Sequence, residues 1–322
     1  MLLIKGLIAC LTVSMLASLA SAQPFPSRPI RLIVPVVPGA ATDVLARVTG
    51  DWIAQQSGQS VVVENRPGAG GMIAINFVAR SEPDGHTLLF TADGQIIMQP
   101  LISEQKTIDP LTDLVSVAPI ADLPTVLAIS AKLPTKTLQE FVAYGKANPG
   151  KLNYASSGIG SAPHIAGAAF AQQAGIDMVH VPYRGLGTAL TDLMAGNVHM
   201  IAAGNATLGP LVQSGALRRL AVTSKQRLPY LPDLITGVEA NYPDLLFSTW
   251  FGLFAPAKTP KPVVDQLNSY IQSFLGNPGV QKRLAESYYD GMKMSPAEFT
   301  DFVKSRIEQG RRLVKELAIE PN

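Results

Sequence analysis

Three segments of the sequence share a construction that suits anion binding. In each, an apolar run of strand length ends, small residues follow, and a helical period begins; the segments are residues 35–43, 155–164 and 181–188. Small residues let a ligand approach the main chain, and the first N–H groups of a helix have no partner within the helix. Each segment could therefore receive a negatively charged group through backbone N–H donors.

The candidate ligand-binding residues are the small, hydroxyl-bearing and charged residues of these segments. They are Gly39, Ala40, Ala41, Thr42 and Asp43 in the first segment, Ser156, Ser157, Gly158, Gly160, Ser161 and His164 in the second, and Arg184 in the third. Glycine and serine are also ordinary turn and cap residues, so each segment keeps a purely structural interpretation.

Three of these residues keep specific alternatives. Asp43 is either a helix-cap or first-turn residue or an acceptor for a ligand amino or hydroxyl group. Arg184 meets either a second carboxylate or solvent. His164 lies in the first turn of its helix, a place that suits packing or capping better than catalysis.

Signatures of catalysis and metal binding are missing from the sequence. It contains no P-loop, no dinucleotide-binding glycine pattern, no nucleophile elbow and no H-E-x-x-H zinc motif. Ser157 and His164 could suggest a hydrolase, but their spacing alone does not set up a nucleophile and a base without a third group to orient them. His86, His180 and His199 lack metal-ligand spacing. We therefore expect a binding protein with no catalytic residue and no metal site.

The elements that must position these segments alternate between strands and helices. Strands are expected at residues 30–37, 61–63, 87–91, 126–130, 152–155, 178–181, 198–202, 220–223 and 249–255. Helices are expected at residues 44–56, 71–79, 138–147, 163–174, 188–195 and 263–275, with a last helix that opens on a capping box at Ser295. This pattern predicts an α/β fold built around a mainly parallel sheet.

The length predicts two lobes with a cleft between them. A chain of 322 residues exceeds the size at which a single core stops growing. We assign residues 23–124 plus 248–322 to lobe 1, a discontinuous α/β unit, and residues 125–247 to lobe 2. Two crossings between lobes make a hinge, and a hinge implies a cleft that can close.

The first 22 residues have the pattern of an export signal. One early lysine is followed by an apolar run, and Ala20, Ser21 and Ala22 supply a small-residue cleavage site, which places the mature start at Gln23. The alternatives are a membrane anchor, for which the run is short, and a lipoprotein whose acylated residue is Cys10, the only cysteine. The signal predicts a periplasmic location, cleavage after Ala22 and a mature chain without a disulfide.

Charge balance argues against nucleic acid as a partner. The sequence has 26 basic and 24 acidic residues, a net charge of +2. A protein that binds phosphate backbones concentrates basic charge, and here no basic run is longer than two residues.

The sequence resembles the Bug family, the extracytoplasmic binding proteins of tripartite tricarboxylate transporters. The resemblance is carried by residues 25–30, 61–71, 83–89, 220–224 and 250–256 together with the second and third segments, in order along nearly the whole mature chain. It implies a type II-like, Venus-flytrap periplasmic-binding-protein fold, no cofactor, and a carboxylate held by backbone amides, hydroxyls and bridging waters. By position it also brings Thr91, Asp93 and Asn205 to the cleft.

The same resemblance implies a monomer that works with the membrane permease subunits of such a transporter. One departure concerns the first segment, where the family usually has a second glycine and this sequence has Ala40. We therefore expect capture of a small mono- or dicarboxylate, aliphatic or aromatic. The alternatives are a periplasmic sensor that presents the ligand to a membrane receptor, and a Ser-dependent hydrolase.

Overall fold

The structure is a computed structural model that describes residues 25–103 and 108–317. The predicted signal peptide, residues 1–22, lies outside the described residues, as does Cys10. Within the described ranges, no helix combines the length and the apolar character that a bilayer crossing requires.

One sheet forms the centre of the first lobe. Its strands are β2 (Val61–Asn65), β1 (Ile30–Val34), β3 (Thr87–Ala92), β9 (Ser248–Pro256) and β4 (Leu114–Ser130), in that spatial order, with the short β10 (Asp290–Gly291) beside β4. The first three run parallel, and β9, β4 and β10 pair antiparallel. Successive residues of β1 enter different core clusters, Leu32 in one and Ile33 in the other, because both faces of this sheet are covered.

A second sheet forms the centre of the second lobe. It contains β6 (Met178–Pro182), β5 (Leu152–Ser156) and β7 (Met200–Gly204), which run parallel, followed by the far end of β4 and then β8 (Leu217–Val222). Two further core clusters cover its two faces, one around Phe141 and Phe170 and the other around Ile201 and Leu208.

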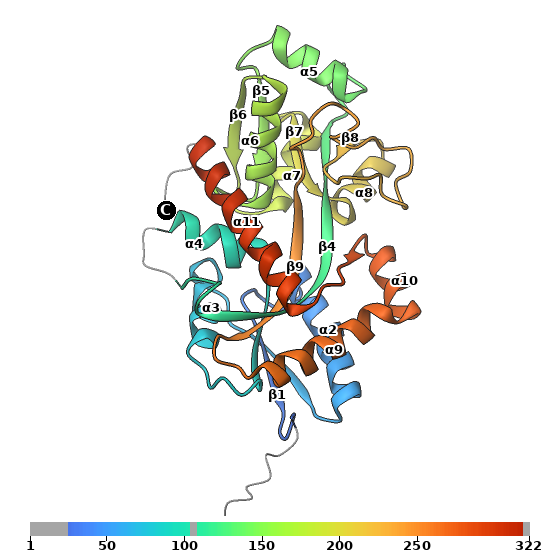
Figure 1. Ribbon diagram of the computed structural model, residues 1–322. Helices are drawn as coiled ribbons and strands as arrows, with labels where there is room; N and C mark the ends of the chain where they lie inside the picture. The colour runs from blue at the N-terminus through green and yellow to red at the C-terminus, as the bar shows by residue number, and fades with distance from the viewer. Residues whose placement is uncertain (1–24, 104–107, 318–322) are drawn as a thin grey trace, which may run out of the picture.

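Helices flank the two sheets (Figure 1). Those of the first lobe are α2 (Ala41–Ser57), α3 (Met72–Ala79), α4 (Gln99–Ile102), α9 (Lys261–Gly276), α10 (Pro278–Glu286) and α11 (Pro296–Glu316), with the short turns η1 (Ala69–Gly71) and η2 (Gly94–Met98). Those of the second lobe are α5 (Leu138–Ala147), α6 (Ala162–Ala174), α7 (Leu186–Ala195) and α8 (Asn205–Gln213). The predicted capping box at Ser295 is confirmed.

Two adjacent strands connect the lobes, and Figure 1 shows them running side by side between the upper and lower halves of the molecule. Strand β4 continues from the first sheet into the second, and Pro124 of β4 is paired with Ser248 of β9 where the chain returns. The fold is therefore the predicted two-lobed α/β periplasmic-binding-protein fold.

Several predictions about individual elements were wrong. The sheets are mixed rather than mainly parallel, because β4 and β9 run antiparallel to their neighbours. The sequence predicted only the end of β4, since Pro119 and Pro124 argue against a strand; β4 accommodates Pro119 next to register shifts against β9. Helix α8 was missed because it contains Pro210. The lobe boundaries at residues 124/125 and 247/248 stay predictions.

Candidate functional site

A cavity of about 640 Å³ lies between the lobes. Six of the sequence-predicted residues line it: Ala41, Thr42, Asp93, Ser157, Gly160 and Ser161. The first three come from the lobe built on β1 and β3, and the other three follow β5 in the second lobe. The first and second predicted segments therefore face each other across this cavity.

The first turns of four helices line the cavity. Ala41 and Thr42 open α2, Ala162 and Pro163 open α6, Leu186 opens α7, and Ala206 and Thr207 lie in the first turn of α8. None of these helices has a side-chain hydrogen bond at its N-cap, which is Ala40, Ser161, Gly185 or Gly204. The first-turn N–H groups and the positive ends of the helix dipoles are thus left for another acceptor.

No cationic side chain of residues 25–103 and 108–317 lines this cavity, so its attraction for an anion would come from main-chain N–H and hydroxyl donors. Of the described residues that line it, none is Lys, Arg or His, and Asp93 is the one carboxylate. Hydroxyl and amide side chains complete the polar part of the wall; they include Thr42, Thr125, Ser157, Thr207 and Thr249, with Gln95 and Gln99. Such a wall can bind an anion through N–H and O–H donors and leaves the rest of the guest in mostly uncharged surroundings.

The first segment is held in place by Asp43. Its carboxylate accepts hydrogen bonds from the backbone N–H of Gly39 (2.8 Å), from Asn65 Nδ2 (2.8 Å) and from Arg47 (2.9 and 3.1 Å). The Arg47 guanidinium, followed by these other donors and opposed by burial, lowers the pKa of Asp43 to about 2. Asp43 is therefore a first-turn residue whose charge is used within its own lobe.

The alanine that departs from the family pattern fits its backbone position. Gly39 has φ +84°, in the left-handed region that favours glycine. Ala40 has φ −68° and ψ 158°, values that any L-residue adopts. The methyl group at position 40 therefore requires no backbone strain.

The second segment is held by uncharged partners. Ser156 is fully buried, and its Oγ lies 2.7 Å from His180 Nε2 and accepts the N–H of Gly158 at 3.1 Å. The hydroxyl of Ser161 donates to the carbonyl of Gly158 at 2.7 Å, so its proton is used inside the loop. Ser161 can therefore accept from a ligand, but in this arrangement it does not add the hydroxyl donor that the sequence suggested.

His164 and His180 pack against each other beneath this segment. Their ring centroids are 3.9 Å apart, and His164 Nδ1 accepts the N–H of Gly160 at 3.1 Å. Burial lowers the pKa of both imidazoles, and with the nearby His164 it lowers the pKa of His180 to about 4. His164 therefore packs against His180 and supports the loop at Gly160. Packing was one of the roles expected for it.

The Ser157 and His164 pair that a hydrolase would need is not among the contacts of the residues that the structure describes. The serine paired with a histidine is Ser156, whose side chain is shielded from the cavity, whereas Ser157 lines the cavity. Within residues 25–103 and 108–317, no group of three or more His, Cys, Asp or Glu side chains is placed to hold a metal ion.

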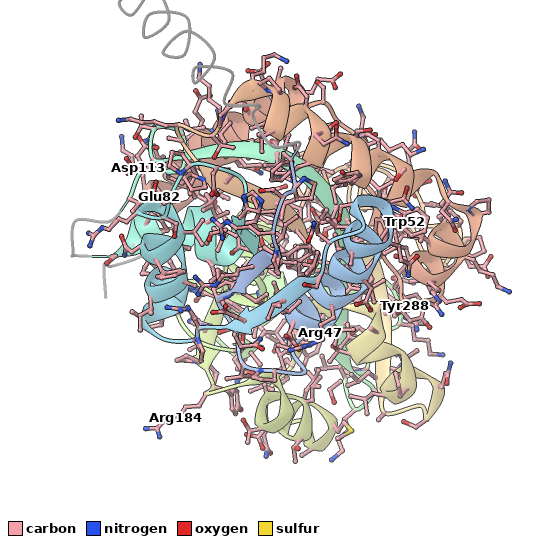
Figure 2. All side chains as sticks on the ribbon, turned by 90° about the horizontal axis from the view of Figure 1, so that it is seen from below. Arg47, Trp52, Glu82, Asp113, Arg184 and Tyr288 are labelled. Carbon is pink, nitrogen blue, oxygen red and sulfur yellow. The ribbon has the colours of Figure 1, made fainter. Side chains whose placement is uncertain are left out.

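The remaining predicted residues do not line the cavity. Ala40, Asp43, Gly158 and His164 are next in the chain to lining residues, and Gly39 is two residues from Ala41. Thr91 and Ser156 are buried in their strands, and Asn205 is buried, where its Oδ1 accepts from Arg219 Nε at 2.8 Å. Arg184 is exposed and extends away from the body of the protein in Figure 2. The structure therefore favours the solvated alternative for Arg184.

Sequence reasoning missed several parts of the wall, and two of them had a signal in the sequence. One is the glycine-rich turn at η1, which contributes Gly68, Gly70 and Gly71. Its signal was present, because this turn belongs to the motif at residues 61–71. The other is the start of α8 with Ala206 and Thr207, whose signal was a small-residue run directly after an apolar strand, the same construction as in the other three helices.

Related proteins are similar in sequence to this chain over almost its full length. A sequence profile described as "Tripartite tricarboxylate transporter family receptor" matches residues 45–319. A UPF0065 protein in the tcbD-tcbE intergenic region of Pseudomonas sp. (strain P51) is 35% identical and covers 99% of this chain and 96% of its own length. Protein BugT of Bordetella pertussis is 33% identical, covering 94% of this chain and 93% of its own length.

Solved structures share the fold. The protein Rpa4515 of R. palustris, solved with adipate, is 32% identical with a TM-score of 0.80 and covers 92% of this chain and 100% of its own. MatC of Rhodopseudomonas palustris, with bound malate, is 30% identical with a TM-score of 0.75, covering 90% and 100%. These matches show that the chain belongs to the tripartite tricarboxylate transporter receptor family, the Bug family of periplasmic solute-binding proteins.

Proposed function

We propose that this chain captures a small mono- or dicarboxylate in the cavity between its lobes, as a monomer, and delivers it to the membrane permease subunits of a tripartite tricarboxylate transporter. The observation that carries the proposal is the set of helix N-termini, without side-chain caps, that lines one cavity. The bound adipate of Rpa4515 and malate of MatC support the ligand class. Residues 1–22 would direct the chain to the periplasm and be removed after Ala22.

Hydrogen bonds from the main chain supply most of the expected affinity. A helix dipole contributes about 0.3 to 1 kcal/mol, whereas a hydrogen bond to a charged acceptor contributes about 1.5 to 3 kcal/mol. A micromolar ligand needs about 8 kcal/mol, so roughly five such bonds suffice after ordering costs are subtracted. The first turns of α2, α6, α7 and α8 and the nearby hydroxyl groups offer that number of donors.

Binding without chemistry is part of the proposal. The one serine in this region that is paired with a histidine, Ser156, is fully buried and holds the loop. We expect no turnover of carboxylic esters by the wild-type chain, and none to be lost in Ser157→Ala. Ester hydrolysis that disappears in Ser157→Ala would instead support the hydrolase alternative.

A thermal-shift screen against carboxylic acids, each paired with its neutral amide, tests the ligand class. We expect at least one acid to raise the melting temperature and its amide not to, because the donors of the cavity wall complement a negative charge. The shift should shrink in Thr42→Ala and in Ser157→Ala. Equal responses to acids and amides, or no response across aliphatic and aromatic acids, would contradict the proposal.

Deleting the gene separates transport from sensing. Loss of uptake of the ligand from the screen supports delivery to a permease. Loss of ligand-dependent gene induction with uptake intact supports the sensor alternative. The mass of the secreted protein, expected to begin at Gln23, tests the cleavage site and the location together.

A further inference from the structure

We propose that Asp93 is a specificity-determining residue that takes up a proton when the cleft captures a carboxylate, so that the ligand is held by a neutral carboxylic acid. This inference rests on the proposed function and names the chemistry of one position in its site. A carboxylate in the wall of an anion-binding cavity would otherwise repel the guest.

The position of Asp93 places it in two cavities at once. It follows β3, directly before η2, and lines both the cleft cavity and a smaller cavity behind it. The smaller cavity is lined by apolar side chains, among them Ile97, Ile165 and Trp250, and by Arg306. Asp93 is therefore partly buried beside apolar side chains and also reaches the space that the ligand would enter.

The ionisable groups around Asp93 do not neutralise it. Arg306 of α11 shares the smaller cavity, but its guanidinium bonds to Gln309 Oε1 at 2.7 Å and to Ser248 Oγ at 3.4 Å. Asp122 of β4 is a second nearby carboxylate, with Asp290 of β10 beyond it, and the Tyr289 side chain lines the cleft cavity. In the part of the chain that the structure describes, Asp93 forms no ion pair.

Burial already moves Asp93 toward the neutral form. Desolvation, the largest effect, raises the pKa of Asp93 to about 7, although the backbone N–H of Gly94 and Arg306 oppose it. A ligand anion that enters the same cavity adds a like charge and raises the pKa further. The protonated acid then becomes a hydrogen-bond donor to a ligand carboxylate, in a wall that has no cationic side chain.

The sign of the pH dependence follows from this linkage. Since the pKa of Asp93 is higher in the complex than in the free protein, binding takes up a proton near and above pH 7. Affinity is then fully developed below about pH 7 and falls by up to about tenfold per pH unit above it. A ligand that carries an ammonium group toward Asp93 would show the opposite slope, because it favours the ionised form.

Isothermal titration of the mature chain with adipate, malate and benzoate, from pH 6 to pH 8.5, tests the proposal. In two buffers of different ionisation enthalpy, the wild type should take up protons on binding near pH 8, up to one per ligand. In Asp93→Asn the amide still offers a donor, and we expect binding with no proton uptake and no loss of affinity between pH 7 and pH 8.5. Asp122→Asn is the control, since Asp122 is also a partly buried carboxylate but does not line the cleft cavity; proton uptake and the fall of affinity with pH should persist in it, with the onset at lower pH because a like charge near Asp93 is removed.

The outcomes separate this inference from the proposed function. Proton release, a flat wild-type profile, or a slope that persists in Asp93→Asn would overturn the role of Asp93 and leave carboxylate capture standing. Failure of all three acids to bind the wild type at every pH would count against both. The buffer dependence of the wild type needs no variant, so the test remains decisive even if Asp93→Asn does not fold.

Discussion

The two segments that face each other across the cleft are supported by different chemistry. In the first, the ionised carboxylate of Asp43 collects donors from Gly39, Arg47 and Asn65. In the second, neutral groups do the work, with Ser156 on His180 and His164 on the N–H of Gly160. An ionised side chain holds the first loop and neutral side chains hold the second. In both cases no side chain caps the N-terminus of the helix that follows.

The difference between the supports predicts different sensitivity to acid. A carboxylate with a lowered pKa stabilises the fold until the pH falls below its unfolded value of about 3.9. Histidines with a lowered pKa must stay neutral, so their contribution begins to fall at about pH 6.5. Acid should therefore weaken the second segment first.

The largest expected effect comes from removing one donor of the first segment. Ala41→Pro deletes the first N–H of α2, and the backbone tolerates it because Ala40, with ψ 158°, has the conformation that precedes proline. We expect the Kd for the bound acid to rise roughly ten- to hundredfold, the value of one hydrogen bond to a charged acceptor. Ala41→Val adds similar volume and keeps the N–H; an equal loss in both variants would contradict donation by this group.

Replacing the Asp43 carboxylate should lower the free energy of unfolding, and only at a pH at which Asp43 is charged. Because the pKa of Asp43 is lowered from 3.8 to about 2, Asp43→Asn should reduce the free energy of unfolding by about 2 kcal/mol at pH 7. The gap between variant and wild type should close as the pH falls from about 4 to 2, as urea unfolding would measure. A gap that stays constant over this range would show that the loop does not depend on the charge.

The neutral support should show its effect in a different pH range. Between pH 6.5 and about 4 the wild type should lose thermal stability, because His180 is held neutral in the fold with its pKa lowered to about 4. His180→Gln can still meet the hydroxyl of Ser156 but does not titrate, so its melting temperature should fall less over this range. Parallel curves for the two proteins would exclude His180 as the acid-sensitive group.

The third predicted segment supplies the smallest effect. Arg184 is exposed and extends away from the protein (Figure 2). We expect Arg184→Ala to change the Kd less than twofold in titration calorimetry. A tenfold loss would mean that this arginine turns into the cleft when the lobes close.

The placement of the cleft segments followed from local patterns. Strand ends, small residues and helix starts are visible in a single stretch of sequence, and Ala41, Thr42, Ser157 and Gly160, which were singled out from such patterns, line one cavity in the structure. The hydrogen bonds that hold these segments in place were not predicted, because some of the partners are distant in the sequence. Asn65, which donates to Asp43, is 22 residues away, and His180, which contacts Ser156, is 24 residues away.

The elements that were missed contain residues that usually interrupt regular structure. Because of Pro119 and Pro124, the part of β4 that crosses between the lobes was not predicted as a strand. It pairs with β9, with register shifts on either side of Pro119. Pro210 hid α8, which packs Leu208 into the core and presents its first turn to the cavity. In each case tertiary pairing outweighs the local preference, and sequence patterns do not register that contribution.

A crystal structure with an acid selected by the thermal-shift screen tests the central claim most directly. We predict a ligand carboxylate in the cleft cavity, with oxygens about 2.7 to 3.1 Å from main-chain nitrogens in the first turn of α2 and in the turn that opens α6. A ligand whose carboxylate is held by lysine or arginine side chains, or that lies outside this cavity, would contradict the account.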